Sequence, residues 1–328
     1  MDSSPRDMRF LTYDELQPSM ETTRAATNIG SFGRFLTPRE IRSWRSHGAF
    51  AEYVGVFAVE RGEVVGQTFV SRPPYTYPDG SRGRIAGVAL VGSRPDRSGR
   101  GIARQMIEEV HRREREEGIE HVALWTNRSW GAHGVYERLG YRDVFLNPFA
   151  VRAVPRPRGR ARRVSRTRAA RRTDLPALDV LHSRATRGRV GFTPRLPGTL
   201  AKQAAMDELD AKKELIVVPR VGRTRGYARV EVDHDRIRCS ELLAEGPTAA
   251  RSLLDALEEK ARGRVLAWNL SPLRDLRSEL EARKYFLVRA GWYVFMARSV
   301  RHESSTAVVR GALGVQDPRW TVHETDRF

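Results

Sequence analysis

The chain has 328 residues, enough for two domains, and 40% of them are hydrophobic and 30% charged, as in a globular protein. It contains no apolar run of the ~18 residues that a membrane span requires, and its start has no apolar signal-peptide core. The single cysteine, Cys239, excludes an internal disulfide framework and a cysteine-rich zinc site. These features predict a cytoplasmic protein with no membrane contact and no bound metal.

The formal net charge of +18 suggests nucleic acid or another polyanion as a partner. However, 53 arginines and only five lysines supply the positive charge, and the arginines are spread along the whole chain. An arginine-rich source genome would give the same excess. Nucleic-acid binding is therefore an alternative that the charge alone does not establish.

The first half of the chain alternates between strand and helix patterns. Thr37, Pro38 and Glu40 mark one helix start, because they supply a cap, a proline in the first turn and the acid of a capping box. In chain order we expect a strand at 8–13, helices at 14–27 and 36–44, strands at 51–60 and 64–72, a loop at 73–83, a strand at 84–92, a helix from 102, a strand at 121–126, a short helix ending at Gly140, and a strand or strand pair at 142–151.

The segment Pro155–Arg172 has nine arginines and no acid, which is typical of a solvated linker that leads into a strand. Beyond it the order of elements recurs. "ALWTNRS…VYERLGY" aligns with "LAWNLSP…ELEARKY", so that Tyr136 corresponds to Leu280 and Gly140 to Lys284. The elements expected are a helix at 173–185, strands at 214–220, 225–233 and 236–245, a helix at 246–261, a strand at 264–271, a helix at 273–284 and a strand pair at 285–300. We interpret the chain as two copies of one α/β unit with a mixed sheet.

Between the strand at 84–92 and the next helix lies "RPDRSGRGIARQMIEEV", in which glycines and arginines directly precede the helix. A helix N-terminus has unpaired N–H groups and the positive end of the helix dipole. A glycine-rich turn that leads into it can therefore wrap a phosphate group. The plain alternative is a glycine-containing turn between a strand and a helix.

The order of a strand, "PDRSGRGIA", a helix, a strand ending at Asn127 and a helix with "YERLGY" resembles the GNAT superfamily of CoA-dependent N-acyltransferases. The resemblance covers residues 8–150 and extends to the second half in element order alone. The loop pattern of the family, Arg/Gln-x-x-Gly-x-Gly/Ala, has Ser98 in its first position here, and Arg97 or Arg100 is expected to supply the missing charge. Arg104 adds a further cation. The resemblance implies that the CoA pyrophosphate is bound by the loop Ser98, Gly99, Arg100, Gly101, Ile102 and Ala103.

In this family an amine attacks the acetyl thioester directly, and a tyrosine on the short helix protonates the departing thiolate. Tyr136 matches this tyrosine, and a phenol with a pKa near ~10 is a suitable acid. Its alternative role is that of a core aromatic. A backbone N–H between Val91 and Ser93 is implied as the oxyanion donor. Asn127 matches a position that contacts the cofactor arm, and it is also a candidate helix N-cap.

The general base is open, because the strand at 84–92 has no carboxylate. His133, one turn before Tyr136, and water are two candidates. The tandem arrangement is also similar to that of the enhanced-intracellular-survival acetyltransferases, in which a chain-terminal carboxylate acts as the base. That similarity makes the carboxylate of Phe328 a third candidate, with Asp326 as a substitute.

Two further interpretations concern the acceptor and the second half. The loop "PPYTYPDG" places Tyr75, Tyr77 and Asp79 near the expected acceptor side, which suits an amine on a partly apolar body. The second half lacks the devices of the first, because Pro247 stands where a cradling N–H is needed and Leu280 replaces the tyrosine.

We therefore predict two GNAT-like domains in tandem: a catalytic domain at 1–154, a linker at 155–163, a degenerate domain at 164–300 and a tail at 301–328. The predicted activity is transfer of an acetyl group from acetyl-CoA to an amine of a small-molecule or peptide acceptor. The acceptor, the acyl chain length and the oligomeric state stay open. The alternatives are a non-catalytic CoA-binding or scaffold protein and a nucleic-acid-binding protein that uses the arginine-rich segment.

Overall fold

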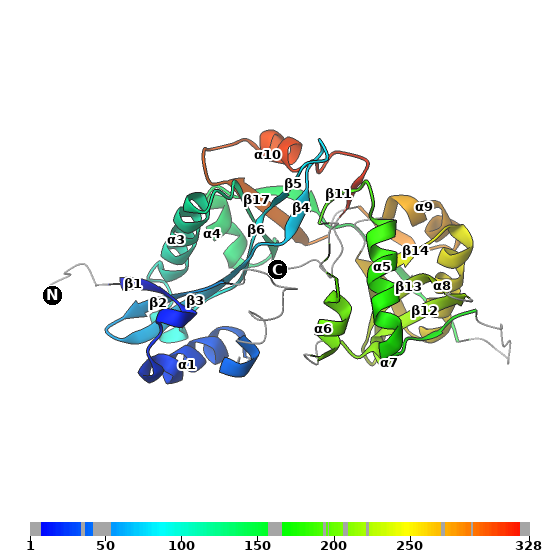
Figure 1. Ribbon diagram of the computed structural model, residues 1–328, viewed down its shortest axis with the longest axis horizontal. Helices are drawn as coiled ribbons and strands as arrows, with labels where there is room; N and C mark the ends of the chain where they lie inside the picture. The colour runs from blue at the N-terminus through cyan, green and yellow to red at the C-terminus, as the bar shows by residue number, and fades with distance from the viewer. Residues whose placement is uncertain are drawn as a thin grey trace.

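Two mixed β-sheets covered by helices, and a small third sheet between them, make up the computed structural model (Figure 1). The structure describes residues 8–33, 37–41, 54–156, 166–192, 195, 197–205, 209–220, 223–269, 273–289 and 291–321. The predicted α/β fold with mixed sheets is confirmed.

The first sheet has the strand order β1-β2-β3-β6-β7-β17-β8. Its strands pair antiparallel except for the parallel pair of β6 and β7. The strands are β1 Met8–Thr12, β2 Val54–Glu60, β3 Glu63–Ser71, β6 Ala86–Ser93, β7 His121–Asn127, β8 Arg142–Leu146 and β17 Tyr293–Ser299.

The helices α1 (Glu21–Phe32) and α3 (Ile102–Glu116) cover opposite faces of the first sheet. A Cβ atom on Gly66 would lie 2.7 Å from Ile102 of α3, whereas one on Gly92, next to the register partner of Gly66, would lie 2.6 Å from Ser31 of α1. Adjacent positions of a strand pair face opposite ways, so the two helices sandwich the sheet. The shorter elements of this half are η1 Tyr13–Glu15, η2 Pro18–Met20, η4 Pro95–Arg97 and α4 Gly131–Arg138.

Two predicted helix starts in this half have different outcomes. The helix predicted at 14–27 is broken near Pro18 into two 3₁₀ turns, and the α-helix begins at Glu21. The predicted capping box is confirmed, because the Thr37 backbone N–H donates to Glu40 at 2.7 Å and the Glu40 N–H donates to the Thr37 hydroxyl at 3.1 Å. The end of that predicted helix, residues 42–44, lies outside the described residues.

The second sheet repeats the arrangement with the order β10-β12-β13-β14-β15-β9-β16. Its one parallel pair, β14 with β15, takes the place of β6 with β7. The strands are β9 Phe149–Ala153, β10 Arg168–Ala169, β12 Leu215–Arg220, β13 Arg223–Val232, β14 Arg236–Ala244, β15 Val265–Asn269 and β16 Phe286–Val288. The helices are η5 Arg172–Asp174, α5 Leu175–Ala185, α6 Thr199–Ala205, α7 Ala211–Glu214, α8 Pro247–Lys260 and α9 Leu273–Ala282.

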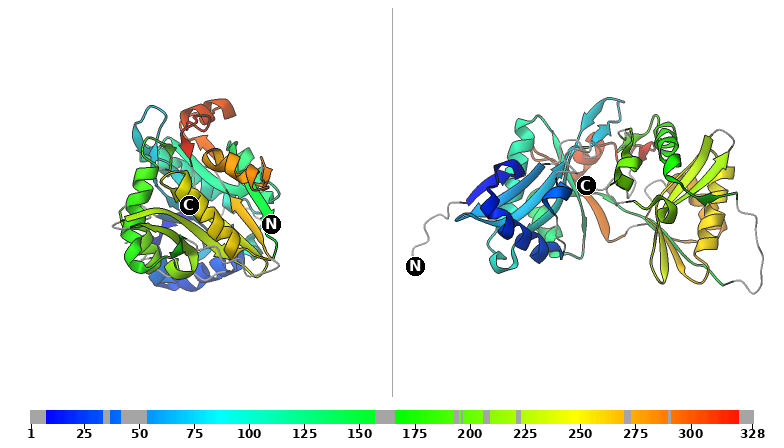
Figure 2. Two further views of the ribbon diagram at one scale, coloured as in Figure 1. Left: turned by 90° about the vertical axis from the view of Figure 1, so that its right-hand side faces the viewer. Right: turned by 60° about the horizontal axis from the view of Figure 1, so that its bottom comes forward.

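Each sheet contains one strand from the other half of the chain. β9 directly follows β8 of the first sheet but pairs with β15 and β16 of the second. In return, β17 follows β16 of the second sheet but lies between β7 and β8 of the first. Figures 1 and 2 show two bodies with segments passing between them. One strand on each side of the predicted boundary near residue 154 therefore belongs to the sheet of the other half: β9 lies in the second sheet and β17 in the first.

A four-stranded sheet, β18-β11-β4-β5, joins the two halves to the C-terminal segment. Its strands are β4 Pro74–Thr76, β5 Arg82–Arg84, β11 Val190–Gly191 and β18 Trp320–Thr321, and α10 (Thr306–Ala312) precedes β18. The prediction of a plain loop at 73–83 was wrong. β4 and β5 form a hairpin, and β4 also pairs with β11, which lies more than a hundred residues later in the chain. Local sequence patterns do not predict such a distant pairing.

The internal repeat is confirmed in backbone detail at the end of the short helix. Gly140 has a φ of 87°, and Lys284, its predicted counterpart, has a φ of 62°. The N–H of Tyr141 donates to the Tyr136 carbonyl, and the N–H of Tyr285 donates to the Leu280 carbonyl in the same way. A positive φ is uncommon for lysine, so the second copy retains a turn that glycine adopts more readily in the first.

Candidate functional site

The parallel strands β6 and β7 separate halfway along their length. They pair from Ala86 and Val122 to Val88 and Leu124. Both strands continue beyond this point, to Ser93 and Asn127, without bonding to one another. The sheet is therefore open between their C-terminal ends, the place where open α/β sheets commonly receive ligands.

A β-bulge in β6 borders this opening. The register with β3 shifts so that Leu90 and Val91 lie opposite the single residue Thr68, and Leu90 has a φ of 49°. A bulge takes backbone groups out of the ladder and is frequent beside active sites. The residues after it are held by α1, because the Ser31 hydroxyl donates to the Ser93 carbonyl at 3.0 Å. Val91 and Ser93, the predicted ends of the oxyanion segment, thus lie at the bulge and at the anchored strand end.

The loop before α3 presents consecutive unbonded N–H groups. Gly99 and Gly101 have φ values of 75° and 74°, which favour glycine, and the N-cap of α3 has no side-chain hydrogen bond. Among the described residues, no acceptor is found for the N–H groups of Gly99, Arg100, Gly101, Ile102 and Ala103. The N–H of Ser98 differs, since it donates to the Pro95 carbonyl at 3.1 Å. The free run therefore begins one residue after the predicted start of the loop.

The loop arginines already have acidic partners. Arg100 donates to Glu60 at 2.7 Å, and Arg97 lies 3.8 Å from the other oxygen of the same carboxylate. Glu60 ends β2 and is buried. Arg104 pairs instead with Glu108 on the exposed face of α3. An anion at the loop would thus compete with Glu60 for two of the three predicted cations, and no feature of the sequence singles out this glutamate.

Tyr136 packs in the core beneath the opening. It shares a buried cluster with Val88 and Leu124, which mark the last paired residues of β6 and β7, and its ring meets the edge of Tyr141 at 5.8 Å. Burial raises its pKa to about 12. The described residues offer no hydrogen-bond partner to its hydroxyl. Tyr136 is thus a core aromatic residue, which was the alternative role predicted for it, and it is also a protonated phenol whose O–H group donates to no described residue.

His133, on the same helix, is engaged by carboxylates. Its Nε2 atom lies 2.9 Å from Asp143, and its Nδ1 atom lies 3.5 Å from Glu137. Asp143 also accepts the guanidinium of Arg128 at 3.2 Å. These contacts hold the N-terminal part of α4 against β8, and they occupy both ring nitrogens of the predicted base.

Asn127 forms a turn ahead of α4 and does not cap it. Its side-chain oxygen accepts the N–H of Ser129 at 2.9 Å and the Ser129 hydroxyl at 2.7 Å, whereas the N-cap of α4 is Trp130. The exchanged strand reaches this point, since Tyr293 is the register partner of Asn127 and contacts the ring of Trp130. Local sequence patterns did not indicate that Tyr293 would lie beside the opening.

The three residues predicted near the acceptor serve the small sheet instead. The Tyr75 hydroxyl is buried, donates to the Leu313 carbonyl at 2.6 Å and accepts the Trp320 indole N–H at 3.0 Å. Tyr77 packs on Tyr75, and Asp79 accepts hydrogen bonds from Ser81 within the hairpin turn. Their observed role is to anchor the C-terminal segment to the first half.

The second half has a hollow at the corresponding place but not the same groups. A cavity of about 410 Å³ lies between the ends of α5 and β14, the start of α8 and the middle of α9. Pro247 opens α8 and removes an N–H there, as predicted, and the counterpart of Tyr136 is the buried Leu280. This half therefore retains the space without the donor loop or the phenol.

The alternative bases, a metal site and a membrane span can be compared with the structure only over the described residues. Phe328 and Asp326, the alternative bases, lie outside them. Within the described chain, no group of three or more His, Cys, Asp or Glu side chains is arranged to hold a metal ion. None of the described helices has the length and apolar character needed to cross a membrane.

Comparisons with known proteins agree with this geometry. Residues 9–144 match the family model described as "Acetyltransferase (GNAT) domain". No curated protein matches the sequence.

Solved structures share the fold over most of the chain. A conserved protein of unknown function from Enterococcus faecalis V583 has a TM-score of 0.67 at 13% identity, over 89% of this chain and 73% of that one. A GCN5-related N-acetyltransferase from Kribbella flavida has a TM-score of 0.59 at 19% identity, over 90% and 71%. Eis1 from Mycobacterium abscessus has a TM-score of 0.59 at 19% identity, over 90% and 74%. Because the structural match spans both sheets, it supports the tandem arrangement.

Proposed function

We propose that this protein, whose residues 9–144 form a GNAT acetyltransferase domain, transfers an acetyl group from acetyl-CoA to an amine. The observation that carries the proposal is the run of free N–H groups from Gly99 to Ala103, at the end of β6 where β6 and β7 have separated. Such a run at a helix N-terminus suits a pyrophosphate. The opening beside it suits the extended arm that joins a pyrophosphate to a thioester.

In the proposed reaction, the nitrogen of the acceptor amine attacks the thioester carbonyl carbon. A backbone N–H of the Val91–Ser93 segment, next to the bulge, stabilises the negative charge that develops on the carbonyl oxygen. The C–S bond then breaks, and Tyr136 donates its proton to the departing thiolate. The phenol is protonated at neutral pH and is therefore in the form that can donate, while its raised pKa makes it a weaker acid than an exposed tyrosine.

The proton of the attacking amine passes to water in this proposal. What supports water over His133 is that both nitrogens of His133 contact carboxylates, at 2.9 and 3.5 Å. Asn127 is proposed to contact the cofactor arm through its amide N–H₂ group, since its oxygen already accepts two hydrogen bonds from Ser129.

The test is release of free thiol from acetyl-CoA by the full-length chain, with a panel of lysine peptides, polyamines, amino sugars and aromatic amines. Calorimetric titration with CoA runs in parallel. Amine-dependent thiol release together with saturable CoA binding is expected. Binding without release for any amine would favour the non-catalytic alternative, and absence of CoA binding would refute the proposal.

A further inference from the structure

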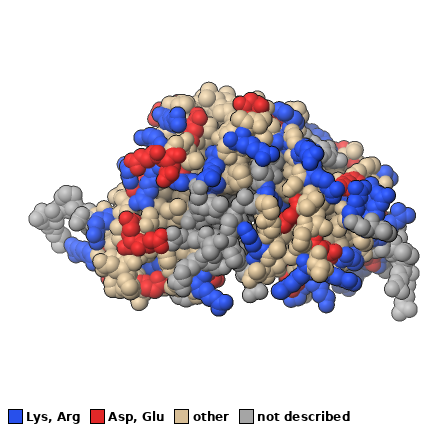
Figure 3. All heavy atoms as spheres, viewed as in Figure 1, with Lys and Arg blue, Asp and Glu red and all other residues tan. Residues whose placement is uncertain are grey.

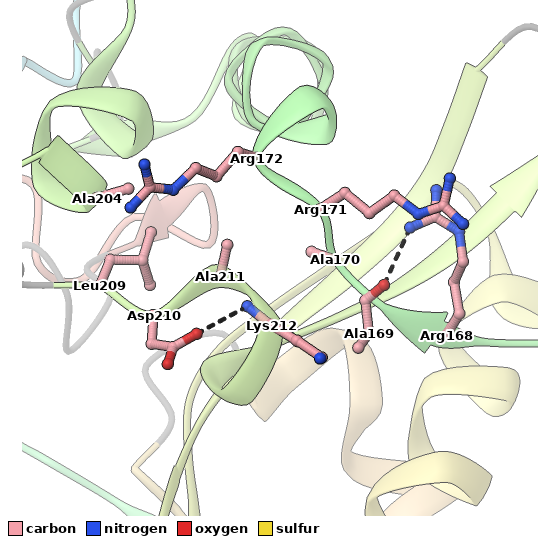
Figure 4. Close-up of a pocket in the computed structure, with 10 residues that line it drawn as sticks. All are labelled: Arg168, Ala169, Ala170, Arg171, Arg172, Ala204, Leu209, Asp210, Ala211 and Lys212. Atoms are coloured by element: carbon pink, nitrogen blue, oxygen red, sulfur yellow. Dashed lines mark hydrogen bonds between the residues drawn. The ribbon is translucent and has the colours of Figure 1, made fainter.

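A second concave site lies far along the chain from the GNAT loop, at the edge strand of the second sheet. A cavity of about 740 Å³ is bordered on one side by β10 and η5 and on the other by the end of α6 and the start of α7 (Figure 4). Its lining residues are Arg168, Ala169, Ala170, Arg171, Arg172, Ala204, Leu209, Asp210, Ala211 and Lys212.

The floor of this cavity is apolar. Ala170, Ala204, Leu209 and Ala211 are all nearly buried and belong to the core cluster between the second sheet and α5. Their small side chains leave room above the core, and none of them offers a hydrogen bond. The floor therefore suits an apolar or aromatic surface.

The rim carries four cations and one acid. The acid, Asp210, caps α7 and pairs with Lys213 at 3.1 Å. Arg168 is held by Asp174 in a two-bond pair of 2.7 and 2.8 Å. For Arg171, Arg172 and Lys212, by contrast, the described residues provide no side-chain partner.

The exposed cations surround the floor from both sides. In Figure 4, Arg172 extends over the hollow towards Ala204, and Arg171 extends to the opposite end, beside Arg168. The hydrogen bonds from the Arg168 side chain lower the pKa of Asp174, and the backbone N–H and the charge of Arg171 lower it further, whereas the Arg171 guanidinium itself forms no hydrogen bond or ion pair with this carboxylate among the described residues. The rim therefore has an excess of positive charge at more than one point.

Positive charge alone would not distinguish this place. Basic side chains are scattered over both halves of the face seen in Figure 3. Many of the described arginines elsewhere pair with a neighbouring acid, as Arg112 does with Glu109 and Glu116. Here several cations without such partners surround a concave, apolar floor.

We propose that this cavity binds a small phosphate monoester with a flat apolar body. The body would lie on the alanine and leucine floor. The phosphate dianion would bind the guanidinium group of Arg172, which extends over the hollow, because the planar fork of arginine matches phosphate oxygens in two-bond geometry, and Arg171 adds positive charge from the opposite end. Lys212 adds charge from the α7 side as a single donor. The site is separate from the GNAT loop, so its occupancy does not depend on the proposed acetyl transfer.

The experiment is calorimetric titration of the full-length chain with adenosine monophosphate at 150 mM salt. We expect one molar equivalent of adenosine monophosphate to bind. The double variant Arg171→Glu/Arg172→Glu should weaken binding at least tenfold. Arg187→Glu, an equal charge change per residue at an exposed position after α5, should change it less than twofold. Ala169→Trp, at an exposed lining residue, should also weaken binding, because it fills the hollow without changing any charge.

Three outcomes would overturn the proposal. The first is no saturable binding by the wild-type chain. The second is binding of several equivalents that Arg187→Glu weakens as much as the rim variants do, which indicates a general cationic surface. The third is tight binding of a single-stranded oligonucleotide through Arg171 and Arg172 with no binding of the monophosphate.

The design separates this site from the acetyl-transfer site. A Gly101→Glu chain should still bind the monophosphate, and the rim double variant should still bind CoA. Loss of CoA binding alone would thus leave this proposal standing, and loss of monophosphate binding alone would leave the acetyl-transfer proposal standing.

Discussion

Arg100 donates a hydrogen bond of 2.7 Å to Glu60, so that the loop before α3 is joined to the end of β2 by a cation the loop could otherwise offer to a ligand. Replacing Glu60 with Gln removes the competing negative charge. We expect Glu60→Gln to tighten CoA binding about threefold, which corresponds to ~0.7 kcal/mol. Calorimetry measures the change. Glu108→Gln is the matched control, because it removes the same charge from the partner of the exposed Arg104. A weaker CoA affinity in Glu60→Gln would show that Glu60 positions the loop rather than competing with the ligand.

Gly101 lies in the middle of the free N–H run, where a carboxylate would block the backbone and repel a pyrophosphate. Gly101→Glu is expected to abolish CoA binding while the protein stays folded, since an added Cβ would meet nothing closer than Gln105 at 3.9 Å. Gly118→Glu controls for backbone strain, because Gly118 has a φ of 76° and open space around it. Both variants should lose about 1 kcal/mol of folding stability. Unchanged CoA affinity in Gly101→Glu would remove the loop from the site.

The Tyr136 hydroxyl has a proposed chemical role, and the described residues give it no hydrogen-bond partner. Tyr136→Phe should therefore lower kcat about a hundredfold, with little effect on KM or on thermal stability. With its pKa at about 12, the phenol should not impose a fall in kcat between pH 8 and 10. Tyr141→Phe is the contrasting variant, since it loses a hydrogen bond of 2.9 Å to His111. It should lose stability and keep its turnover. The reverse pattern would assign Tyr136 to the core alone.

His111 gives the fold a pH dependence of defined sign. Burial, together with the nearby positive charges of Arg298 and Arg115, lowers its pKa to about 3. The unfolded chain, with a histidine pKa near ~6.5, binds more protons between these values. Stability from this group is thus complete above pH 6.5 and falls as the pH drops towards 3.

Urea unfolding at pH 7.5 and pH 5 measures this effect. His111→Gln, which can keep a bond to Tyr141, should remove about 2 kcal/mol of the stability loss between these two values. His234→Gln, at an exposed position, should leave the loss unchanged. A wild-type slope that persists in His111→Gln would assign the titration to other buried histidines.

The stoichiometry of CoA tests the difference between the two halves. The cavity of the second half has Pro247 at its helix start and Leu280 in place of a phenol, so we expect one CoA per chain. Gly246→Glu, with a φ of 84° and no neighbouring atoms, should leave this single site unaffected. Two equivalents in the titration, reduced to one by Gly246→Glu, would mean that the second half binds CoA as well.

The features that short stretches of sequence predict correctly are those made by neighbours in the chain. The glycine-rich turn at Gly99 and Gly101, the helix that follows it and the capping box at Thr37 all arise within a few residues. The repeat is also predicted correctly, because "ALWTNRS…VYERLGY" aligns with "LAWNLSP…ELEARKY", and the aligned Gly140 and Lys284 both have a positive φ.

The features that could not be predicted depend on distant partners. The sequence predicts a loop around Tyr75, whereas in the structure its hydroxyl forms hydrogen bonds with the distant residues Leu313 and Trp320. The sequence predicts Glu60 only as the end of a strand, whereas in the structure its carboxylate pairs with Arg100 of the loop. Tyr293 follows the strands of the second sheet in the sequence but lies in the first sheet. There β17 forms hydrogen bonds with the backbone N–H and C=O groups at the edge of β7, and local sequence patterns do not predict this pairing.

The exchange of β9 and β17 has a consequence for how the chain is made. A ribosome releases residues in order, and β17, which fills the space between β7 and β8, emerges after every strand of the second sheet. Until then the nascent first sheet has two unsatisfied edges in its middle, of the kind that pair with other chains. The GNAT half, although encoded first, is thus completed last, and gene fragments cut at the composition boundary near residue 155 would each carry one strand that belongs to the other product.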